Sequence, residues 1–151
     1  WEEARIQGLR TGRGFNHGLL EIKKLGKEYD YYVMLTGDCM FQSAPEPNFK
    51  KLIDLFEEVP KLGILSPVSP RWGNDCPKDR KLFPMFLLPL VCYMFRKECL
   101  DGLISGTDYY DYLFSCRENF RCYDSDTEIC IKSYINDFMF CLNRLNYLDK
   151  A

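Results

Sequence analysis

The chain has 151 residues, of which 46% are hydrophobic and 15% aromatic, and this composition excludes a disordered chain. The length predicts a single domain. Its 20 basic and 22 acidic residues give a formal charge of −2 without a basic cluster, so we expect no nucleic-acid partner. The longest apolar stretch, 82–95, contains two prolines and is too short to span a bilayer, so no transmembrane segment is predicted.

The first residue is Trp1 and no signal peptide is visible. We therefore interpret 1–151 as a single domain that is incomplete at its N-terminus. Eight cysteines form no Cys-x-x-Cys pair, and His17 is the single histidine, so the zinc signal is weak. We therefore expect reduced thiols and a cytoplasmic protein, with a position at the membrane surface left open.

The first half of the chain predicts helices that alternate with strands. Residues 8–18 hold four glycines and predict a turn that opens a helix, because the apolar residues of 19–25 recur at helical spacing. The run 31–35 is rich in strand formers and stops at a polar turn. A helix is predicted near 49–56, and 63–66 predicts a second buried strand.

The second half continues the alternation. A third strand is predicted over 90–95 and a short helix over 97–104, followed by an irregular aromatic segment at 105–123. A helix over 127–138 then leads into a last strand at 138–142. The predicted buried face of that helix comprises Ile131, Tyr134, Ile135 and Phe138.

Strands that alternate with helices predict an α/β fold with three layers, α/β/α, around a mostly parallel sheet. Ligands of such sheets bind at the carboxyl ends of the strands, where loops carry the chemistry. The turn Thr36-Gly37-Asp38 stands at such an end and is the first candidate site.

Two acidic segments are candidates for chemistry. Asp38 follows a strand directly and suits either turn capping or the binding of Mg²⁺ or Mn²⁺ that bridges a substrate diphosphate. Asp124, Asp126 and Glu128 occupy alternate positions at a helix start. Helix capping and proton transfer near a substrate hydroxyl are both open for these acids.

Two further features have a structural and a functional interpretation. Arg10 and Arg13 would suit phosphate oxygens, although exposed arginines in loops usually contact only water. The aromatic segment suits either core packing or the wall of a sugar pocket. Its rings belong to Tyr109, Tyr110, Tyr112 and Phe114.

The order of these motifs resembles family-2 glycosyltransferases. In that family an Asn-x-Gly helix, as in Asn16-His17-Gly18, precedes a strand that ends in an Asp-x-Asp-like motif, as in 29–38. The segment 49–67 is similar to the family's next helix and strand, 92–100 to its acceptor-side strand, and 124–132 to its Glu-Asp segment. The resemblance implies a GT-A-like fold, the Rossmann-like architecture of nucleotide-diphospho-sugar transferases, whose first strand would precede Trp1.

The resemblance also implies roles for particular residues. Asp38 matches the metal ligand of the family, and Asp126 matches the catalytic base, with Ser125 where a glutamate is usual. The cofactor would be Mg²⁺ or Mn²⁺. The residues implied to bind the nucleotide-diphospho-sugar donor are Asn16, Gly18, Thr36, Gly37 and Asp38.

The implied reaction is an inverting sugar transfer to a hydroxyl of a glycan, lipid-linked or protein acceptor, as in polysaccharide biosynthesis. A homodimer is left open. Two alternatives to this function also stay open: a non-catalytic module of the same fold that binds a sugar nucleotide or a carbohydrate, and a nucleotidyltransferase.

Overall fold

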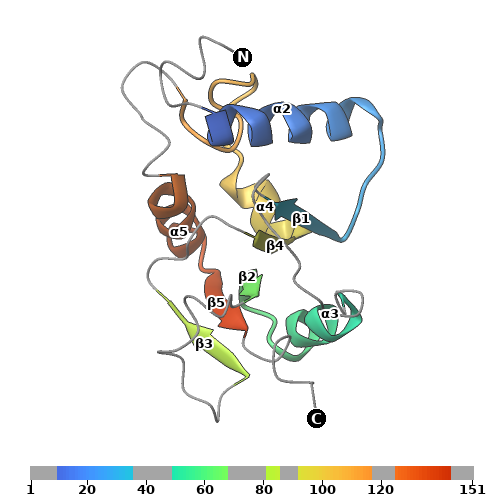
Figure 1. Ribbon diagram of the computed structural model, residues 1–151, viewed down its shortest axis with the longest axis vertical. Coiled ribbons are helices and arrows are strands. Elements are labelled where there is room, and N and C mark those ends of the chain that lie inside the picture. The colour runs from blue at the N-terminus through green and yellow to red at the C-terminus, as the bar shows by residue number, and fades with distance from the viewer. Residues whose placement is uncertain (1–9, 36–48, 68–80, 86–91, 117–124, 144–151) are drawn as a thin grey trace.

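The structure is a computed structural model, and it describes residues 10–35, 49–67, 81–85, 92–116 and 125–143. This part of the chain forms four helices and five strands, whose arrangement is drawn in Figure 1. In chain order they are α2 (Arg10–Lys24), β1 (Tyr31–Leu35), α3 (Phe49–Glu58), β2 (Leu62–Pro67), β3 (Leu82–Pro84), β4 (Cys92–Arg96), α4 (Lys97–Leu103), α5 (Ser125–Ile135) and β5 (Met139–Asn143).

The five strands form one open sheet of order β1-β4-β2-β5-β3. Only β2 and β5 pair in parallel, whereas the other three pairs are antiparallel. The mixed α/β class is confirmed, but the prediction of a mostly parallel sheet is wrong for the described strands. The reason is that β4 lies between β1 and β2 and runs opposite to both, which the alternation of helices and strands along the sequence cannot reveal.

The pairing directions bring the last residues of three strands to the same end of the sheet. Because β1 and β2 both run antiparallel to β4, and β5 runs parallel to β2, these three strands point the same way. Their last residues, Leu35, Pro67 and Asn143, therefore lie at the same end of the sheet, which we call the carboxyl end. Cys92, the first residue of β4, pairs with Leu35 there.

Helices cover both faces of the sheet (Figure 1). Met34 and Tyr93 point to one face, where they join a buried cluster with residues of α2, α4 and α5. We call it the α5 face. Met94 and Leu65 point to the other face and pack against α3, where the ring of Phe56 is completely buried. Alternate residues of a strand point to opposite faces, so the two clusters follow from the strand sequences.

The predicted glycine-rich turn before the first helix is wrong, because α2 already begins at Arg10 and includes Gly12, Gly14 and Gly18. Gly12 has a packing reason. A Cβ atom there would lie 3.0 Å from Sγ of Cys116 and 3.3 Å from Cβ of Phe114. A glycine thus lets the helix approach the segment that follows α4 closely.

The buried face of α5 also differs from the prediction. Ile129, Cys130 and Ser133 face the core with exposed fractions of 3% or less. Three members of the predicted stripe, Ile131, Tyr134 and Ile135, point to solvent with exposed fractions of 54%, 77% and 74%. The fourth, Phe138, follows the end of the helix and packs against the core as predicted.

Candidate functional site

The first turn of α5 lies toward the carboxyl end of the sheet. Near its other end the helix approaches α4, since Oγ of Ser133 lies 3.9 Å from Sγ of Cys99. Cys99 lies in the first turn of α4, close to Arg96, which is the last residue of β4. Arg96 pairs with Tyr31, the first residue of β1, so Cys99 is near the end of the sheet opposite the carboxyl end. The helix then leads through Phe138 into β5, which starts at the same end. The helix therefore runs opposite to β5, and Asp126 is turned toward the carboxyl end.

Tyr93 provides an independent link between Asp126 and the end of β1. Tyr93 is only 1% exposed and pairs directly with Met34, the residue before Leu35. Burial raises the pKa of Tyr93, and the neighbouring Cys130 and Asp126 raise it further. The charge of Asp126 thus reaches a buried side chain that stands beside the end of β1 on the α5 face.

The carboxylate of Asp126 has one hydrogen-bond donor among the described residues. Its Oδ1 accepts the backbone N–H of Thr127, the next residue, at 2.9 Å, and an acid in the first turn of a helix also interacts favourably with the helix dipole. Among the described residues it has no ion-pair partner, and it is partly exposed. The capping interpretation and a chemical role are therefore compatible.

Glu128, by contrast, is fully engaged. It accepts hydrogen bonds from the backbone N–H of Ser115 at 3.1 Å and from its hydroxyl at 2.9 Å, and it pairs with Lys132 at 2.8 Å. Lys132 also donates to the carbonyl oxygen of Leu113 at 2.6 Å. These two residues fix residues 104–116, which we call the 104–116 loop, to α5. Asp124, the third acid of the predicted cluster, lies outside the described residues.

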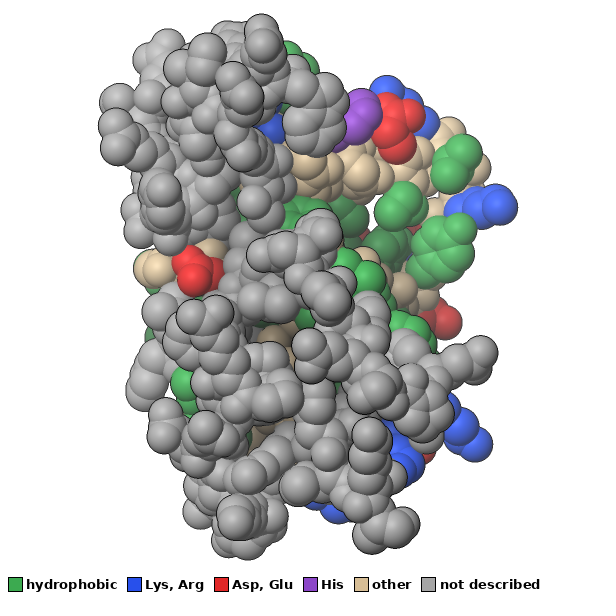
Figure 2. All heavy atoms as spheres, in the orientation of Figure 1, with side chains coloured by type: hydrophobic (Ala, Val, Ile, Leu, Met, Phe, Trp, Pro, Cys, Tyr) green, Lys and Arg blue, Asp and Glu red, His purple; other side chains and the backbone are tan. Residues whose placement is uncertain are grey.

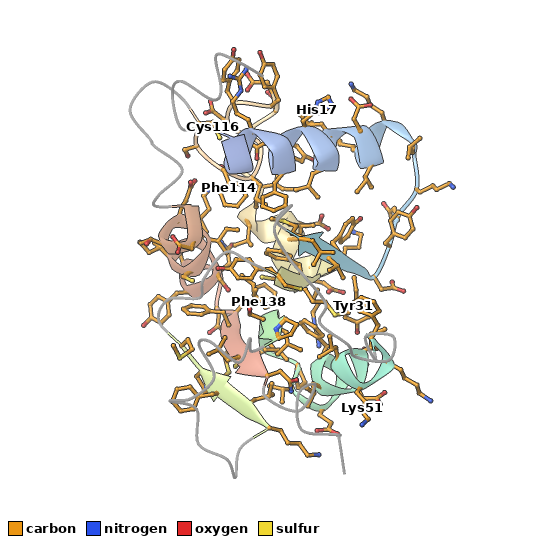
Figure 3. The ribbon with its side chains drawn as sticks, viewed as in Figure 1. His17, Tyr31, Lys51, Phe114, Cys116 and Phe138 are labelled. Atoms are coloured by element: carbon orange, nitrogen blue, oxygen red, sulfur yellow. The ribbon has the colours of Figure 1, made fainter. Side chains whose placement is uncertain are left out.

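Asn16 fixes the same loop to α2 from the other side. Its side chain is completely buried. Oδ1 accepts the backbone N–H groups of Leu113 at 2.8 Å and Phe114 at 2.9 Å, while Nδ2 donates to the carbonyl oxygens of Tyr109 at 3.0 Å and Phe114 at 2.8 Å. Figure 3 shows Phe114 and Cys116 beside the N-terminal half of α2. We therefore assign to Asn16 the role of holding this loop, because its buried amide has no exposed group that could contact a nucleotide-sugar.

Of the other residues predicted to bind the nucleotide-sugar, only Gly18 belongs to the described part of the chain. Gly18 is exposed on α2, and a Cβ atom there would meet nothing within 4 Å. His17 is exposed next to it, as the purple side chain in Figure 2 shows. Thr36, Gly37 and Asp38 lie outside the described residues, directly after the last residue of β1.

The aromatic segment contains both buried rings and an exposed ring. Tyr112 and Phe114 are 5% and 1% exposed and pack in the core. Tyr109 is 39% exposed, and its ring lies 4.1 Å from that of Tyr110 between centroids. The guanidinium carbon of Arg13 lies 5.0 Å and 4.7 Å from these two centroids. This contact was not predicted, because the glycines around Arg13 indicated a turn and Arg13 lies on a helix.

A hollow of about 400 Å³ lies between α2, β1 and α4, where Tyr32, Lys97 and Leu100 contribute to its lining. Lys97 follows the last residue of β4, so this hollow lies away from the carboxyl end and from Asp126. No group of three or more His, Cys, Asp or Glu side chains able to hold a metal occurs in the described part of the chain. Within the same ranges, no helix has the length and apolar character that crossing a bilayer requires.

The first turn of α5 and the 104–116 loop that is fixed to it thus lie toward the end of the sheet at which β1 ends. A partly exposed carboxylate beside such a fixed loop suits proton transfer to or from a bound hydroxyl. Comparisons of the chain with models of protein families, with curated proteins and with solved structures find no match.

Proposed function

We propose that this chain is a metal-assisted, inverting glycosyltransferase with a GT-A-like arrangement, which transfers a sugar from a nucleotide-diphospho-sugar to an acceptor hydroxyl. One observation carries the proposal. Asp126 lies on the α5 face, which Met34 of β1 also faces, and toward the end of the sheet at which β1 leads directly into Thr36-Gly37-Asp38.

In this proposal Asp38 holds Mg²⁺ or Mn²⁺ at the donor diphosphate, with Gly18, Thr36 and Gly37 as further contacts to the donor. Three peptide units reach at most about 11 Å, so an ion held by Asp38 would sit near the carboxyl end of the sheet. One protein carboxylate suffices, because phosphate oxygens and waters fill the remaining positions. The bound ion would offset the negative charge that develops on the leaving diphosphate.

Asp126 acts as the catalytic base. It removes the proton of the acceptor hydroxyl while that oxygen forms a bond to the anomeric carbon, and the bond from this carbon to the diphosphate oxygen breaks. The nucleoside diphosphate leaves from the opposite side, so the configuration inverts. The partly exposed carboxylate, with a single hydrogen bond to Thr127 among the described residues, retains the lone pairs that this step needs.

The surroundings of Asp126 are suited to holding an acceptor in place. Glu128 ties the 104–116 loop to the first turn of α5, Lys132 ties it to the last turn, and Asn16 ties it to α2. A loop fixed through partly buried, charge-assisted hydrogen bonds and a buried amide can position a substrate hydroxyl without further ordering.

Two measurements on the full chain test the proposal. Titration calorimetry with UDP, GDP, ADP, CDP and dTDP, each with and without Mn²⁺, should find one diphosphate whose affinity depends on the metal. Asp38→Ala should weaken that binding about tenfold or more, whereas Asp126→Asn should leave it largely intact. Asp54→Asn serves as the matched control, because Asp54 is exposed on α3 at the other face of the sheet.

The second measurement is turnover of the nucleotide sugar that matches the bound diphosphate, with water or simple sugars as acceptors. Asp126→Asn should lower the rate by about 10² to 10⁴. Absence of metal-dependent binding for all five diphosphates contradicts the proposal. Turnover that Asp126→Asn does not change also contradicts it, because another group must then be the base. Diphosphate binding without any turnover favours a non-catalytic binding module.

A further inference from the structure

Arg13, Tyr109 and Tyr110 form a compact cluster at the surface, which we call the Arg13 cluster. The two rings lie 4.1 Å apart with an interplanar angle of 33°, and the guanidinium of Arg13 lies over both of them. Among the described residues Arg13 has no carboxylate partner. The stacking holds the plane of the guanidinium against the two rings.

The position of Arg13 on α2 is electrostatically unfavourable in the free protein. The first turn of this helix contains no acidic residue, and the backbone N–H groups of a first helical turn carry partial positive charge. A cation at that place raises the local positive potential. A bound anion would lower it, and the helix end and the arginine would act on that anion together.

The rings are held in place before any ligand binds. The carbonyl oxygen of Tyr109 accepts a hydrogen bond from the buried amide of Asn16 at 3.0 Å, and the backbone N–H of Tyr110 donates to Oδ1 of Asp108 at 2.9 Å. The same loop donates the N–H of Ser115 to Glu128, two residues after Asp126. One loop therefore carries the rings of the Arg13 cluster and contacts the first turn of α5, which holds the proposed base.

We propose that the Arg13 cluster is the acceptor subsite and that the acceptor is an anionic carbohydrate, a sugar that bears a carboxylate or a phosphate. This inference rests on the proposed glycosyltransferase function. The exposed ring of Tyr109 provides an apolar surface for the C–H face of a sugar, and the planar fork of Arg13 suits the two oxygens of an anionic group. A neutral sugar would engage the rings and leave the guanidinium to water.

The test is an NMR titration of the full chain that follows the side-chain Nε–H signal of Arg13 and the ring signals of Tyr109. The probes are glucose, glucuronic acid, glucose 6-phosphate and inorganic phosphate. Glucuronic acid or glucose 6-phosphate should bind about tenfold more tightly than glucose, because a charge-assisted hydrogen bond is stronger than a neutral one. The tighter of the two identifies the anionic group.

Variants separate the parts of the cluster. Arg13→Gln should abolish the preference for the anionic sugars, and Arg13→Lys should retain only part of it because the fork is lost. Tyr109→Leu should weaken the binding of glucose, glucuronic acid and glucose 6-phosphate alike. Lys27→Gln removes one exposed positive charge outside the cluster and should change nothing. Thermal melts of each variant verify that the fold is retained.

Equal affinities for glucose and the anionic sugars, or no response of Arg13 to any of them, overturn the inference. Inorganic phosphate that binds as tightly as glucose 6-phosphate also overturns it, because the sugar ring would then contribute nothing. Titration of the same sample with Mn²⁺ and the nucleoside diphosphate separates the two proposals. If that binding persists, only the acceptor inference fails, and if it is also lost, the proposed function fails.

Discussion

Asn16 and Phe114 are joined by two hydrogen bonds between the side-chain amide of Asn16 and the backbone of Phe114. Oδ1 of Asn16 accepts the backbone N–H of Phe114 at 2.9 Å, and its Nδ2 donates to the carbonyl oxygen of the same residue at 2.8 Å. The pair is separated by 98 residues in the sequence and is completely excluded from water. A single buried amide thus replaces the regular backbone pairing that an irregular loop lacks.

Removal of this amide should destabilise the fold strongly. Asn16→Ala leaves two buried N–H groups and two carbonyl oxygens of the loop without a partner, so the free energy of unfolding should fall by about 3–5 kcal/mol. His17→Ala changes the exposed neighbour on the same helix and should stay within about 0.5 kcal/mol. Urea unfolding followed by circular dichroism measures both, and a loss below 1 kcal/mol for Asn16→Ala would disprove the structural role.

Glu128 and Lys132 should be energetically coupled. Their side chains are 12% and 20% exposed and share the polar contacts to the 104–116 loop. A double-mutant cycle with Glu128→Gln and Lys132→Met should give a coupling energy of about 1–2 kcal/mol.

The exposed pair of Lys61 and Asp137 provides the control for that cycle. Its N–O distance is 2.6 Å, yet the side chains are 62% and 83% exposed. Solvent screening should hold its coupling below about 0.5 kcal/mol. Equal coupling in both pairs would show that the contacts of Glu128 to the loop add nothing.

The orientation of α5 can be tested by substitution on its two sides. Ile135 is 74% exposed, so Ile135→Lys should change the free energy of unfolding by no more than about 0.5 kcal/mol. Ile129 is completely buried, and Ile129→Ala should cost about 2–4 kcal/mol. Thermal or urea unfolding decides between the sides, and the reverse order of effects would restore the helix face expected from the sequence.

Stability should decrease at alkaline pH because of buried thiols. Burial raises the pKa of Cys99 to about 12 and that of Cys141 to about 11, from an ordinary value of 9.0. Below pH 9 both thiols are neutral in the folded and unfolded states. As the pH rises above 9, the unfolded chain loses these protons first, so the free energy of unfolding falls until the folded values are reached.

The measurement for this prediction is the urea midpoint between pH 8 and pH 10.5, in the presence of a reducing agent. Cys99→Ala removes one of the two raised pKa values and should show a shallower decline than the unchanged chain. An equally steep decline in the variant would assign the effect to other groups.

The sequence predicted local structure better than relations between distant segments. Runs of strand formers and helical spacing located all but the three-residue strand β3 among the described strands and helices, because these patterns are local. The insertion of β4 between β1 and β2 depends on contacts across more than 25 residues, so the direction of the strands was not accessible. The stripe that includes Tyr134 identified a helix, but periodicity cannot say which side of a helix meets the sheet.

The residues of the candidate site could likewise be predicted from the sequence only where the signal is local. Asp126 could be singled out because an acid at a helix start follows from local spacing. The buried role of Asn16 could not, since its five contacts are with residues more than 90 positions away. The division of the aromatic segment into core rings and the exposed Tyr109 likewise depends on how the loop is folded against α2.

The most direct test of the central claim is paramagnetic broadening by Mn²⁺ in the presence of the nucleoside diphosphate that binds best. The proposal predicts the strongest broadening of backbone amide signals at Leu35 and at Asp126 to Glu128, since both segments would face the ion at the carboxyl end of the sheet. Signals of α4, such as that of Leu103, should be affected least. Broadening that spares the first turn of α5, or that is centred on α4, would contradict the proposed active site.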